Sequence, residues 1–552
     1  MTSAPSFPIP LPSDPPWETW TPPITLGLSG SAKPKLVHVD AWLTEILGIA
    51  PTDLRAVPGA TPTHALVWRI LLLARECLLQ CRVPAFDLPR LLDLRHDGDT
   101  NRMAARVTLP WIDHLSPEFC AEVLQRAAKL IEWCRDRAIE DSDWDAFFDQ
   151  LHDRILLPLG RRVPGGRSTI PILRAAWGLD IPLRHLGAGV YQLGLGRQAR
   201  RLDRSSTDRD AASAARLTQH KGHGARLLRS AGLPTAEHLP ARTLAQARAA
   251  AERLGWPVVV KPVALDRGEG VSVGVNDDAS LERAFTHARK LAPQDDILVE
   301  RQVSGTCHRL FMVNGELLYA VKRRAMGVIG DGRRSVAQLI RENLRAERRL
   351  PPWRRSGLQP LDALAERTLM AVGITADHIP AAGAYVALRP IETTAWGGLD
   401  EDVSDSVHPE NRRLAALASA VLSLEIAGVD IMTPDIGEPW QANGAIVNEV
   451  NYAPLLGGGD VSRARLPDLL RKLLPTGGRI PLHETRGADA WAEALARWQA
   501  WRDEGRAAYL TCADLTLGPD GEPVPMAIRG ARQRVRALLT WPSVEALAWT
   551  GS

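Results

Sequence analysis

The 552-residue sequence predicts an α/β fold, with α+β character, that follows a mainly helical N-terminal part. Three observations support this prediction. Before residue 165, apolar residues recur at three- and four-residue spacing. A Gly/Pro/Arg-rich stretch follows at 161–171, and beyond it short β-branched runs alternate with amphipathic segments. At roughly 100–200 residues per domain, the length allows about three or four domains.

Composition divides the chain into four segments. We predict a flexible Pro-rich arm (1–24), an N-terminal domain (25–165), an α/β domain (166–475) and a small C-terminal part (476–552). Helices in the N-terminal domain are predicted at 66–83, 117–136 and 144–157. This domain has no catalytic constellation, so we expect a scaffold; binding of substrate or partners is the alternative.

Capping residues define the first elements of the α/β domain. Thr243 is a good N-cap for a helix that ends before Gly255, and Asp277 or Asp278 can cap the next helix. Strands are predicted at 257–262, 271–275 and 297–300. The first two strands and their glycine-bearing loop form a predicted hairpin.

Charge and cysteine content exclude several classes of protein. With 67 Lys+Arg against 64 Asp+Glu, the net charge is +3, and no basic run suits a nucleic acid. The apolar stretch 67–81 is broken by Arg69 and Arg75 and is shorter than the roughly 20 residues of a membrane span. The N-terminus lacks the pattern of a signal peptide. Six cysteines without C-x-x-C or metal-ligand spacing favour a reducing, cytoplasmic location.

Lysine is rare in this chain, with eight residues among 67 cations, which makes each lysine notable. Lys261 lies at the end of a predicted buried strand, where an ammonium group needs an anionic partner. The following loop contains Gly268 and Gly270, which allow backbone N–H groups to face a polyanion. The pattern predicts a phosphate-binding loop, although the same two glycines also occur in ordinary turns.

A second candidate site lies far downstream. Asp430 lies in a predicted buried strand, and Glu449 and Asn451 lie two residues apart in the next strand. Side chains two apart share a face of a sheet, so these three groups can converge from adjacent strands. Two acids and an amide suit Mg²⁺ that bridges nucleotide phosphates, and Asp435 is a possible substitute. The alternative is a pair of solvent-facing acids on a hairpin.

Together these motifs resemble the ATP-grasp ligases, and within them the cyanophycin synthetases, from about residue 181 to 454. The segments TQHKGHGARLLRSAGLPTAE, VERQVSG, VIGDGRRSVAQLIREN and DVSDSVHPENRRL carry the resemblance, in that order. It implies an ATP-grasp fold with ATP and Mg²⁺ as ligands. It assigns nucleotide binding to Lys221, Lys261, Gly268, Gly270 and Glu300, catalysis to Arg309 and Arg323, and metal binding to Asp430, Glu449 and Asn451.

The chain departs from that family near the substrate. Cys307 stands where the family has an acid that holds the ribose hydroxyls, and a thiol is a poorer acceptor. Gly327 replaces a usual histidine, and the family's STGG substrate loop is here AWGG at 395–398. These changes imply an acceptor different from that of the cyanophycin synthetases.

The C-terminal part resembles the start of a Mur-ligase-like domain, at 473–495. The segment HETRGADAW contains no G-x-x-x-x-G-K-[ST] phosphate-binding motif. We therefore expect residues 476–552 to be a degenerate, inactive α/β remnant that serves in packing or oligomerisation.

The resemblance implies an ATP-dependent carboxylate–amine ligase that forms an amide through an acyl phosphate. An amino acid or peptide would supply the carboxylate, an amine would be the co-substrate, and the chain would form a homo-oligomer. Two alternatives remain. One is a non-catalytic nucleotide-binding or regulatory homologue, which Cys307 and the altered substrate loop favour. The other is a ligase of the glutathione-synthetase type.

Overall fold

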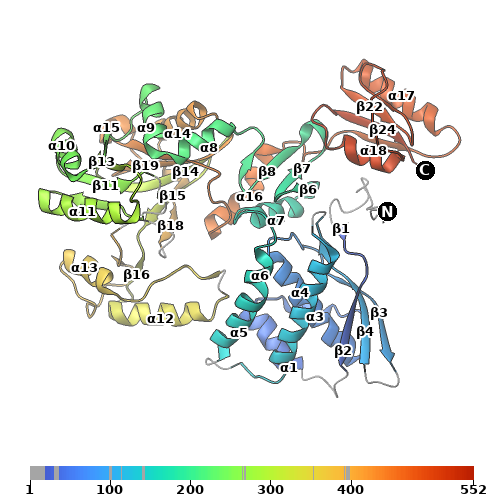
Figure 1. Cartoon of the computed structure of the whole chain (residues 1–552), viewed down its shortest axis with the longest axis horizontal. Helices are drawn as coiled ribbons and strands as arrows, with labels where there is room; N and C mark the ends of the chain where they lie inside the picture. Colours follow the sequence, from blue (N-terminus) through green and yellow to red (C-terminus); the bar gives the residue numbers. More distant parts are fainter. Residues whose placement is uncertain are drawn as a thin grey trace. The chain divides into compact units, whose positions relative to one another are not determined.

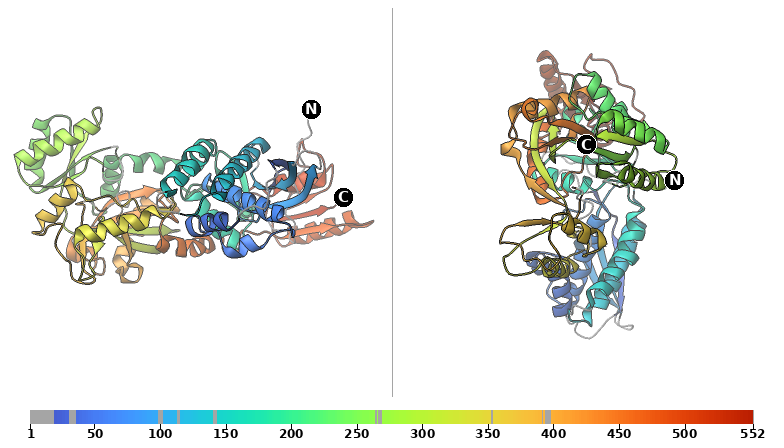
Figure 2. Two further views of the ribbon diagram at one scale, coloured as in Figure 1. Left: turned by 90° about the horizontal axis from the view of Figure 1, so that it is seen from below. Right: turned by 90° about the vertical axis from the view of Figure 1, so that its left-hand side faces the viewer.

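The structure is a computed structural model that describes residues 19–29, 36–97, 102–112, 115–139, 143–263, 265, 269–351, 354–390, 392 and 398–551. The chain divides into two compact units. The first contains residues 1–205, 456–458 and 466–552, and the second contains residues 206–455 and 459–465. Figures 1 and 2 draw both units in sequence colours. The division of the chain into the four segments expected from composition remains a prediction.

The N-terminal part of the first unit is built around the long helices α3 and α4. The helices predicted at 66–83 and 117–136 are confirmed as α3 and α4, and the third prediction divides into α5, a π-helical turn (η3) and α6. The helical elements are α1 (Leu36–Ala41), the π-helical η1 (Trp42–Ile46), α2 (Pro51–Arg55), α3 (Pro62–Gln80), α4 (Pro117–Arg135), α5 (Trp144–Leu151), η3 (His152–Leu156), α6 (Leu157–Gly160) and α7 (Thr169–Gly178). In the described part of the chain, no helix is both long and apolar enough to cross a membrane.

This part also contains a β-sheet that the helical pattern did not predict. Its strands are β2 (Ile24–Ser29), β3 (Arg90–Asp97) and β4 (Arg102–Thr108), in the antiparallel order β2-β4-β3; β1 (Thr19–Trp20) pairs separately with β5 (Pro110–Trp111). The buried Met103, Ala105 and Val107 alternate along β4. Alternation over so short a strand is a weaker signal than the periodicity of the long helices beside it.

The remainder of the first unit joins a small antiparallel sheet to the C-terminal part. The elements are β6 (Leu183–Gly187), β7 (Val190–Leu193), η4 (Gly196–Gln198), β8 (Arg200–Asp203), β21 (Leu482–Thr485), α17 (Ala490–Asp503), β22 (Ala508–Thr511), β23 (Thr516–Leu517), α18 (Ala531–Leu538) and β24 (Ala546–Thr550). In the C-terminal sheet, of order β21-β24-β22-β23, β24 runs parallel to both neighbours. Residues after β7 are hydrogen-bonded to this part: Leu195 N–H donates to the Gly478 carbonyl at 2.7 Å and Gly196 N–H to that of Leu539 at 2.9 Å.

The second unit begins with helices and a four-stranded antiparallel sheet of order β10-β13-β11-β12. Its elements are β9 (Ser206–Thr207), α8 (Ala212–Gln219), α9 (Lys221–Ser230), β10 (His238–Ala241), α10 (Leu244–Leu254), β11 (Val258–Pro262), β12 (Ser272–Val275), α11 (Asp278–Leu291) and β13 (Ile297–Arg301). Thr243 and Asp277 cap α10 and α11 as predicted, each in a reciprocal capping box. Apolar side chains of both helices pack against β11 and β13 in one core.

A five-stranded antiparallel sheet of order β18-β15-β14-β19-β20 forms the centre of the second unit. Its elements are β14 (Thr306–Val313), β15 (Glu316–Arg324), β18 (Leu399–Asp402), η7 (Ser404–Ser406), α14 (Pro409–Val421), β19 (Ile426–Thr433), α15 (Trp440–Asn443) and β20 (Ile446–Tyr452). Helix α14 covers one face, where Leu414, Ala415 and Ala418 join the buried core. The other face carries the polar side chains described below.

A smaller lobe lies between β15 and β18 in the chain. Its strands β16 (Gly327–Ile329) and β17 (Tyr385–Ala387) pair antiparallel and pack with α12 (Val336–Arg348) and α13 (Ala363–Ala371). Helix α16 (Asp460–Leu473) follows β20, begins in the second unit and ends in the first.

Candidate active site

In the structure, the ammonium group of Lys261 contacts a carboxylate on the adjacent strand. Lys261 Nζ lies 2.8 Å from Glu300 Oε2, and both side chains are almost buried. Strands β11 and β13 bring these residues together, since Val259 is the direct partner of Glu300. His238 on β10 is in register with Glu300 from the other side. Burial lowers the pKa of the His238 imidazole below its usual value, against the opposing charge of Glu300. The resemblance assigned Lys261 and Glu300 to the nucleotide, and here they form one ion pair.

The predicted glycine loop joins two paired strands. Strands β11 and β12 form the expected antiparallel hairpin. Gly270 has φ +72°, and a Cβ there would lie 2.8 Å from Pro262 Cγ, so this position requires glycine. Gly268 lies outside the described residues. Lys221 is the first residue of α9, and its side chain is also outside the described part.

Strand register places the other predicted site residues on one face of the five-stranded sheet. Arg309 on β14 is the direct partner of Asp430 on β19, which is the direct partner of Glu449 on β20. Asn451 faces Gly428 two positions along the same pair of strands. Directly paired residues of antiparallel strands share a face, so sheet pairing assembles this group.

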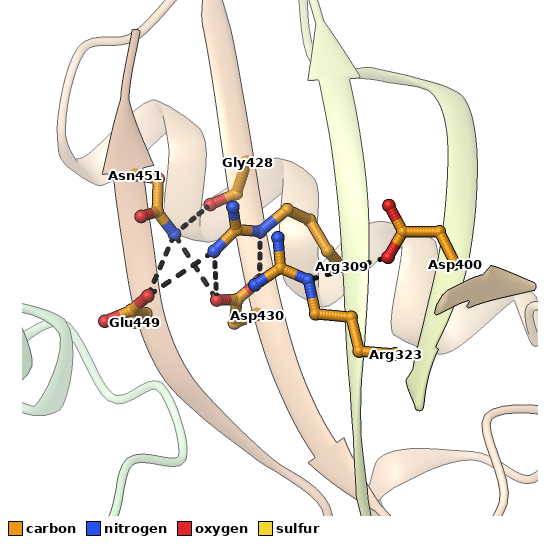
Figure 3. Close-up of polar contacts among 7 residues, drawn as sticks. All are labelled: Arg309, Arg323, Asp400, Gly428, Asp430, Glu449 and Asn451. Atoms are coloured by element: carbon orange, nitrogen blue, oxygen red, sulfur yellow. Dashed lines mark hydrogen bonds and ion pairs between the residues drawn. The ribbon is translucent and has the colours of Figure 1, made fainter. Parts of the chain in front are cut away.

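Short contacts join the members of this group, as Figure 3 shows. Arg309 donates from Nε to Asp430 Oδ1 and from Nη2 to Asp430 Oδ2, both at 2.5 Å. Its Nη2 also lies 3.5 Å from Glu449 Oε1. Arg309 and Asp430 are 9% and 3% exposed at their side chains, whereas Glu449 is 32% exposed. The ion pair of Arg309 with Asp430 is therefore shielded from solvent, whereas the neighbouring Glu449 is accessible to solvent.

Mutual attraction keeps this buried pair ionised. Burial on its own lowers the pKa of Arg309, but the charges of Asp430 and Glu449 raise it above its usual range. Burial raises the pKa of the Asp430 carboxyl, but the Arg309 guanidinium, helped by the charge of Arg323, brings it below its ordinary value. Both groups therefore carry charge in the folded protein, where a single unpaired charge would be costly.

Asn451 completes the polar group at its β20 side. Its Nδ2 lies 3.2 Å from the Gly428 carbonyl, 3.4 Å from Asp430 Oδ2 and 3.3 Å from Glu449 Oε1. The amide nitrogen thus faces both carboxylates. The amide oxygen would face them only if the group were turned over, which breaks these three contacts of Nδ2 and requires a cation between the oxygens.

The donor set fits a hard divalent cation in its chemistry. Asp430, Glu449 and Asn451 offer only oxygen ligands, which Mg²⁺ prefers. Two conditions follow from the contacts: Arg309 has to release an oxygen of Asp430, and the Asn451 amide has to present its oxygen. Among the described residues, no group of three or more His, Cys, Asp or Glu side chains forms a metal site. Asp435, the possible substitute, accepts the Gly437 N–H at 2.7 Å within its own turn.

Arg323 and Cys307 lie beside this group on the same sheet face. Register places Arg309 opposite Val321, and therefore Cys307 next to Arg323. Arg323 Nε is buried and has no hydrogen bond within the described part of the chain. Burial raises the pKa of the Cys307 thiol well above its usual value, so the thiol is protonated. A protonated thiol is a weak donor, consistent with the departure seen in sequence.

Two acids near this face were not predicted from sequence. Glu392 accepts the backbone N–H of Cys307 at 2.8 Å, and Asp400 on β18 faces Arg323. Neither belongs to a motif, and only the pairing of β18 with β15 places Asp400 in the site. Of the expected substrate loop, 395–397 lie outside the described residues. A Cβ at Gly327 would overlap the ring of Tyr385, which fills the space beside it.

The chain is similar in sequence to several known proteins. The family model described as "Carbamoyl-phosphate synthase L chain, ATP binding domain" matches residues 221–313. The cyanophycin synthetase of Nostoc sp. is 30% identical over 349 residues, which are 60% of this chain and 38% of that protein. The glutathione biosynthesis bifunctional protein of Mannheimia succiniciproducens is 30% identical over 213 residues, 37% of this chain and 27% of that protein.

Among solved structures, the bifunctional glutathione synthetase from Pasteurella multocida matches part of this chain. It is 21% identical, with a TM-score of 0.43, and the match covers 65% of this chain and 52% of that one. The chain thus spans well under half of the length of the curated relatives named above. In sequence, the chain is therefore similar to the cyanophycin synthetases over 60% of its length and, at residues 221–313, to an ATP-binding domain.

Proposed function

We propose that this protein is an ATP-dependent carboxylate–amine ligase that acts on an amino acid or peptide through an acyl phosphate. One observation carries the proposal: Arg309, Asp430, Glu449 and Asn451 converge on one sheet face in a homologue of amide-forming ligases. Arginines and acids that converge from separate strands provide positioning and electrostatic stabilisation, which phosphoryl transfer requires.

The nucleotide would bind through the lysines and the hairpin loop. Lys221, Lys261 and the loop with Gly268 and Gly270 would hold the phosphates, and Glu300 would contact the adenine. Magnesium held by Asp430, Glu449 and Asn451 would neutralise charge on the phosphates. Cys307 would lie by the ribose, where its thiol offers weaker hydrogen bonding than a carboxylate.

Two covalent steps then form the amide. An oxygen of the substrate carboxylate attacks the γ-phosphorus of ATP, the bond to the bridging oxygen breaks, and ADP leaves. The amine nitrogen next attacks the acyl carbon, the bond to the phosphate oxygen breaks, and phosphate departs with that electron pair. The ammonium loses two protons in all, to water and to the leaving phosphate. Arg323 and Arg309 would stabilise the charge on the transferred phosphoryl group and on the oxyanion.

A second candidate function is a non-catalytic nucleotide-binding homologue. The contact between Arg309 and Asp430 favours it, because the guanidinium occupies both oxygens of the expected metal ligand. In such a protein the ion pair would be permanent, and the sheet face would be structural.

Release of ADP separates the two candidates. The full chain is incubated with Mg²⁺-ATP and a panel of the twenty amino acids and short peptides, alone and in pairs. A ligase releases ADP only when a suitable carboxylate and amine are present. Glu449→Ala should reduce this turnover at least about 100-fold. The magnesium ion would lose a carboxylate ligand, and the charge on the phosphates would be compensated less well.

The matched control is Glu438→Ala, which removes an exposed acid from the loop between β19 and β20. It should leave turnover unchanged. Absence of amine-dependent ADP release across the panel, together with ATP binding in calorimetry, would support the non-catalytic candidate. Equal loss of activity in both variants would show that Glu449 has no specific role in the reaction.

The other segments have proposed roles as well. Residues 476–552 would be a structural remnant, which the backbone hydrogen bonds of Leu195 and Gly196 support. The N-terminal domain would be a scaffold, the protein would be cytoplasmic, and it would form a homo-oligomer. Sedimentation of the full chain tests the last point.

A further inference from the structure

A carboxylate that no motif predicted lies at the edge of the candidate site. Asp400 is on β18, the outer strand of the five-stranded sheet, and it is the direct partner of Arg323 on β15. It therefore projects from the same face as Arg309 and Asp430, as Figure 3 shows. It follows the expected substrate loop (395–398) by only two residues.

The contact between Asp400 and Arg323 is loose. Arg323 Nε and Asp400 Oδ1 are 4.0 Å apart, compared with 2.5 Å for each contact of Arg309 with Asp430. Within the described part of the chain this is the one ion pair of Asp400, and its side chain is 36% exposed. The carboxylate is therefore available to a cation from solvent.

The neighbours of Asp400 on β18 are already occupied. Glu401 points to the opposite face and pairs with Arg324 at 2.5 Å. Asp402 accepts the Ser404 hydroxyl at 2.5 Å and lies 3.5 Å from Arg465. Two of the three acids on β18, Glu401 and Asp402, therefore have close partners within the chain. Asp400 has only the more distant Arg323 within the described residues.

We propose that Asp400 binds the ammonium group of the incoming amine co-substrate. The inference rests on the proposed ligase function and names the residue that recognises the second substrate. Primary amines are protonated at neutral pH, since an α-amino group has a pKa of about 8. The amine thus reaches the site as a cation, and a partly exposed carboxylate is its natural partner.

The position of Asp400 suits the second step of the reaction. Arg323, assigned to the phosphate and oxyanion, is next to Asp400. An ammonium held by Asp400 would therefore lie beside the group that stabilises the acyl phosphate. It has to lose one proton, to water, before its nitrogen can attack the acyl carbon. Burial raises the pKa of the Asp400 carboxyl and the charge of Arg323 opposes this shift.

The test separates amine binding from acyl phosphate formation. The full chain is assayed with its carboxylate substrate from the amino acid and peptide panel, and the acyl phosphate is trapped with hydroxylamine, which is uncharged at neutral pH. Amide formation is measured in parallel with a primary amine from the same panel. Asp400→Asn removes the charge and keeps the shape, and Glu401→Gln makes the same change on the opposite face of β18.

Asp400→Asn should raise the KM for the amine by about tenfold or more, the usual effect of losing a hydrogen bond to a charged group. Hydroxamate formation and the KM for ATP should stay within about twofold of the wild type. Glu401→Gln should change neither measurement, and Asp400→Glu, which keeps the charge, should recover part of the amine affinity.

Two results would overturn the inference while leaving the ligase function intact. One is an unchanged KM for the amine in Asp400→Asn. The other is an equal loss of hydroxamate and amide in a folded Asp400→Asn variant, which would place Asp400 in the first step. A wild-type chain that forms neither product would overturn the ligase function itself, and the inference with it.

Discussion

The guanidinium of Arg309 binds both carboxylate oxygens of Asp430, although the two residues are 121 positions apart in the chain. The pair lies on adjacent strands in direct register and is almost fully buried. Because both charges are removed from water, each charged group is stable in the interior only while its partner is present. The same carboxylate is the expected metal ligand, so stability and metal binding share one side chain.

Removal of Arg309 should destabilise the second unit. Arg309→Met leaves the Asp430 carboxylate buried without a partner, which we expect to lower the free energy of unfolding by about 3–5 kcal/mol. The double variant Arg309→Met/Asp430→Asn carries no unpaired charge and should recover part of that loss. Urea unfolding of the three proteins measures this. A double variant no more stable than the single one would show that packing, rather than charge, dominates.

Acid should weaken the fold through His308, a buried histidine on β14. Burial lowers the pKa of His308 below its ordinary value of 6.5. The unfolded chain then binds the proton more readily, so stability is full above about pH 6.5 and falls as the pH decreases through that value.

His308→Gln should therefore flatten the pH dependence of stability between about pH 5 and 7. Urea unfolding midpoints across this range provide the measurement. His287→Gln, at an exposed position of α11, is the control and should keep the wild-type slope. An unchanged slope in His308→Gln would assign the acid sensitivity to other groups.

The helical cysteines should resist alkylation until the protein unfolds. Cys77, Cys81, Cys120 and Cys134 are buried, and burial raises the pKa of the Cys81 and Cys120 thiols to about 12. The thiolate is the reactive form, so both access and ionisation protect them. Cys512 is partly exposed.

Mass spectrometry after brief iodoacetamide treatment should find Cys512 modified before these four. Treatment in urea should modify all of them. Early modification of Cys77 or Cys134 in the native protein would indicate that the α3–α4 core opens readily.

A side chain at Gly196 should disturb the contact with the C-terminal part. Gly196 has φ +51°, and a Cβ there would overlap the carbonyl of Val544. Gly196→Ala should lower stability by about 1–3 kcal/mol, from backbone strain together with a displaced neighbour.

Gly477→Ala is the control, since Gly477 also has positive φ, at +64°, but has no atom within 4 Å of its Cβ position. It should cost about 1 kcal/mol or less. Thermal unfolding of both variants measures the difference. Equal shifts would mean that the C-terminal part adapts to the added methyl group.

Much of the fold could be predicted because its signals are local. The capping residues Thr243 and Asp277 defined α10 and α11, and short apolar runs defined β11 and β13. The two-residue spacing of Glu449 and Asn451 correctly placed them on one face of β20. The sheet β2-β4-β3 was missed because its short strands lie between segments with strong helical periodicity.

The sequence by itself determined the elements of the site: the strands, the chemistry of Asp430, Glu449 and Asn451, and the relation to the ATP-grasp ligases. Only the tertiary structure decided which groups meet. The pairing of Arg309 with Asp430, of Lys261 with Glu300, and of Asp400 with Arg323 depends on register between strands. Register is set by the burial of whole sheet faces across long sequence separations, and no local pattern encodes it.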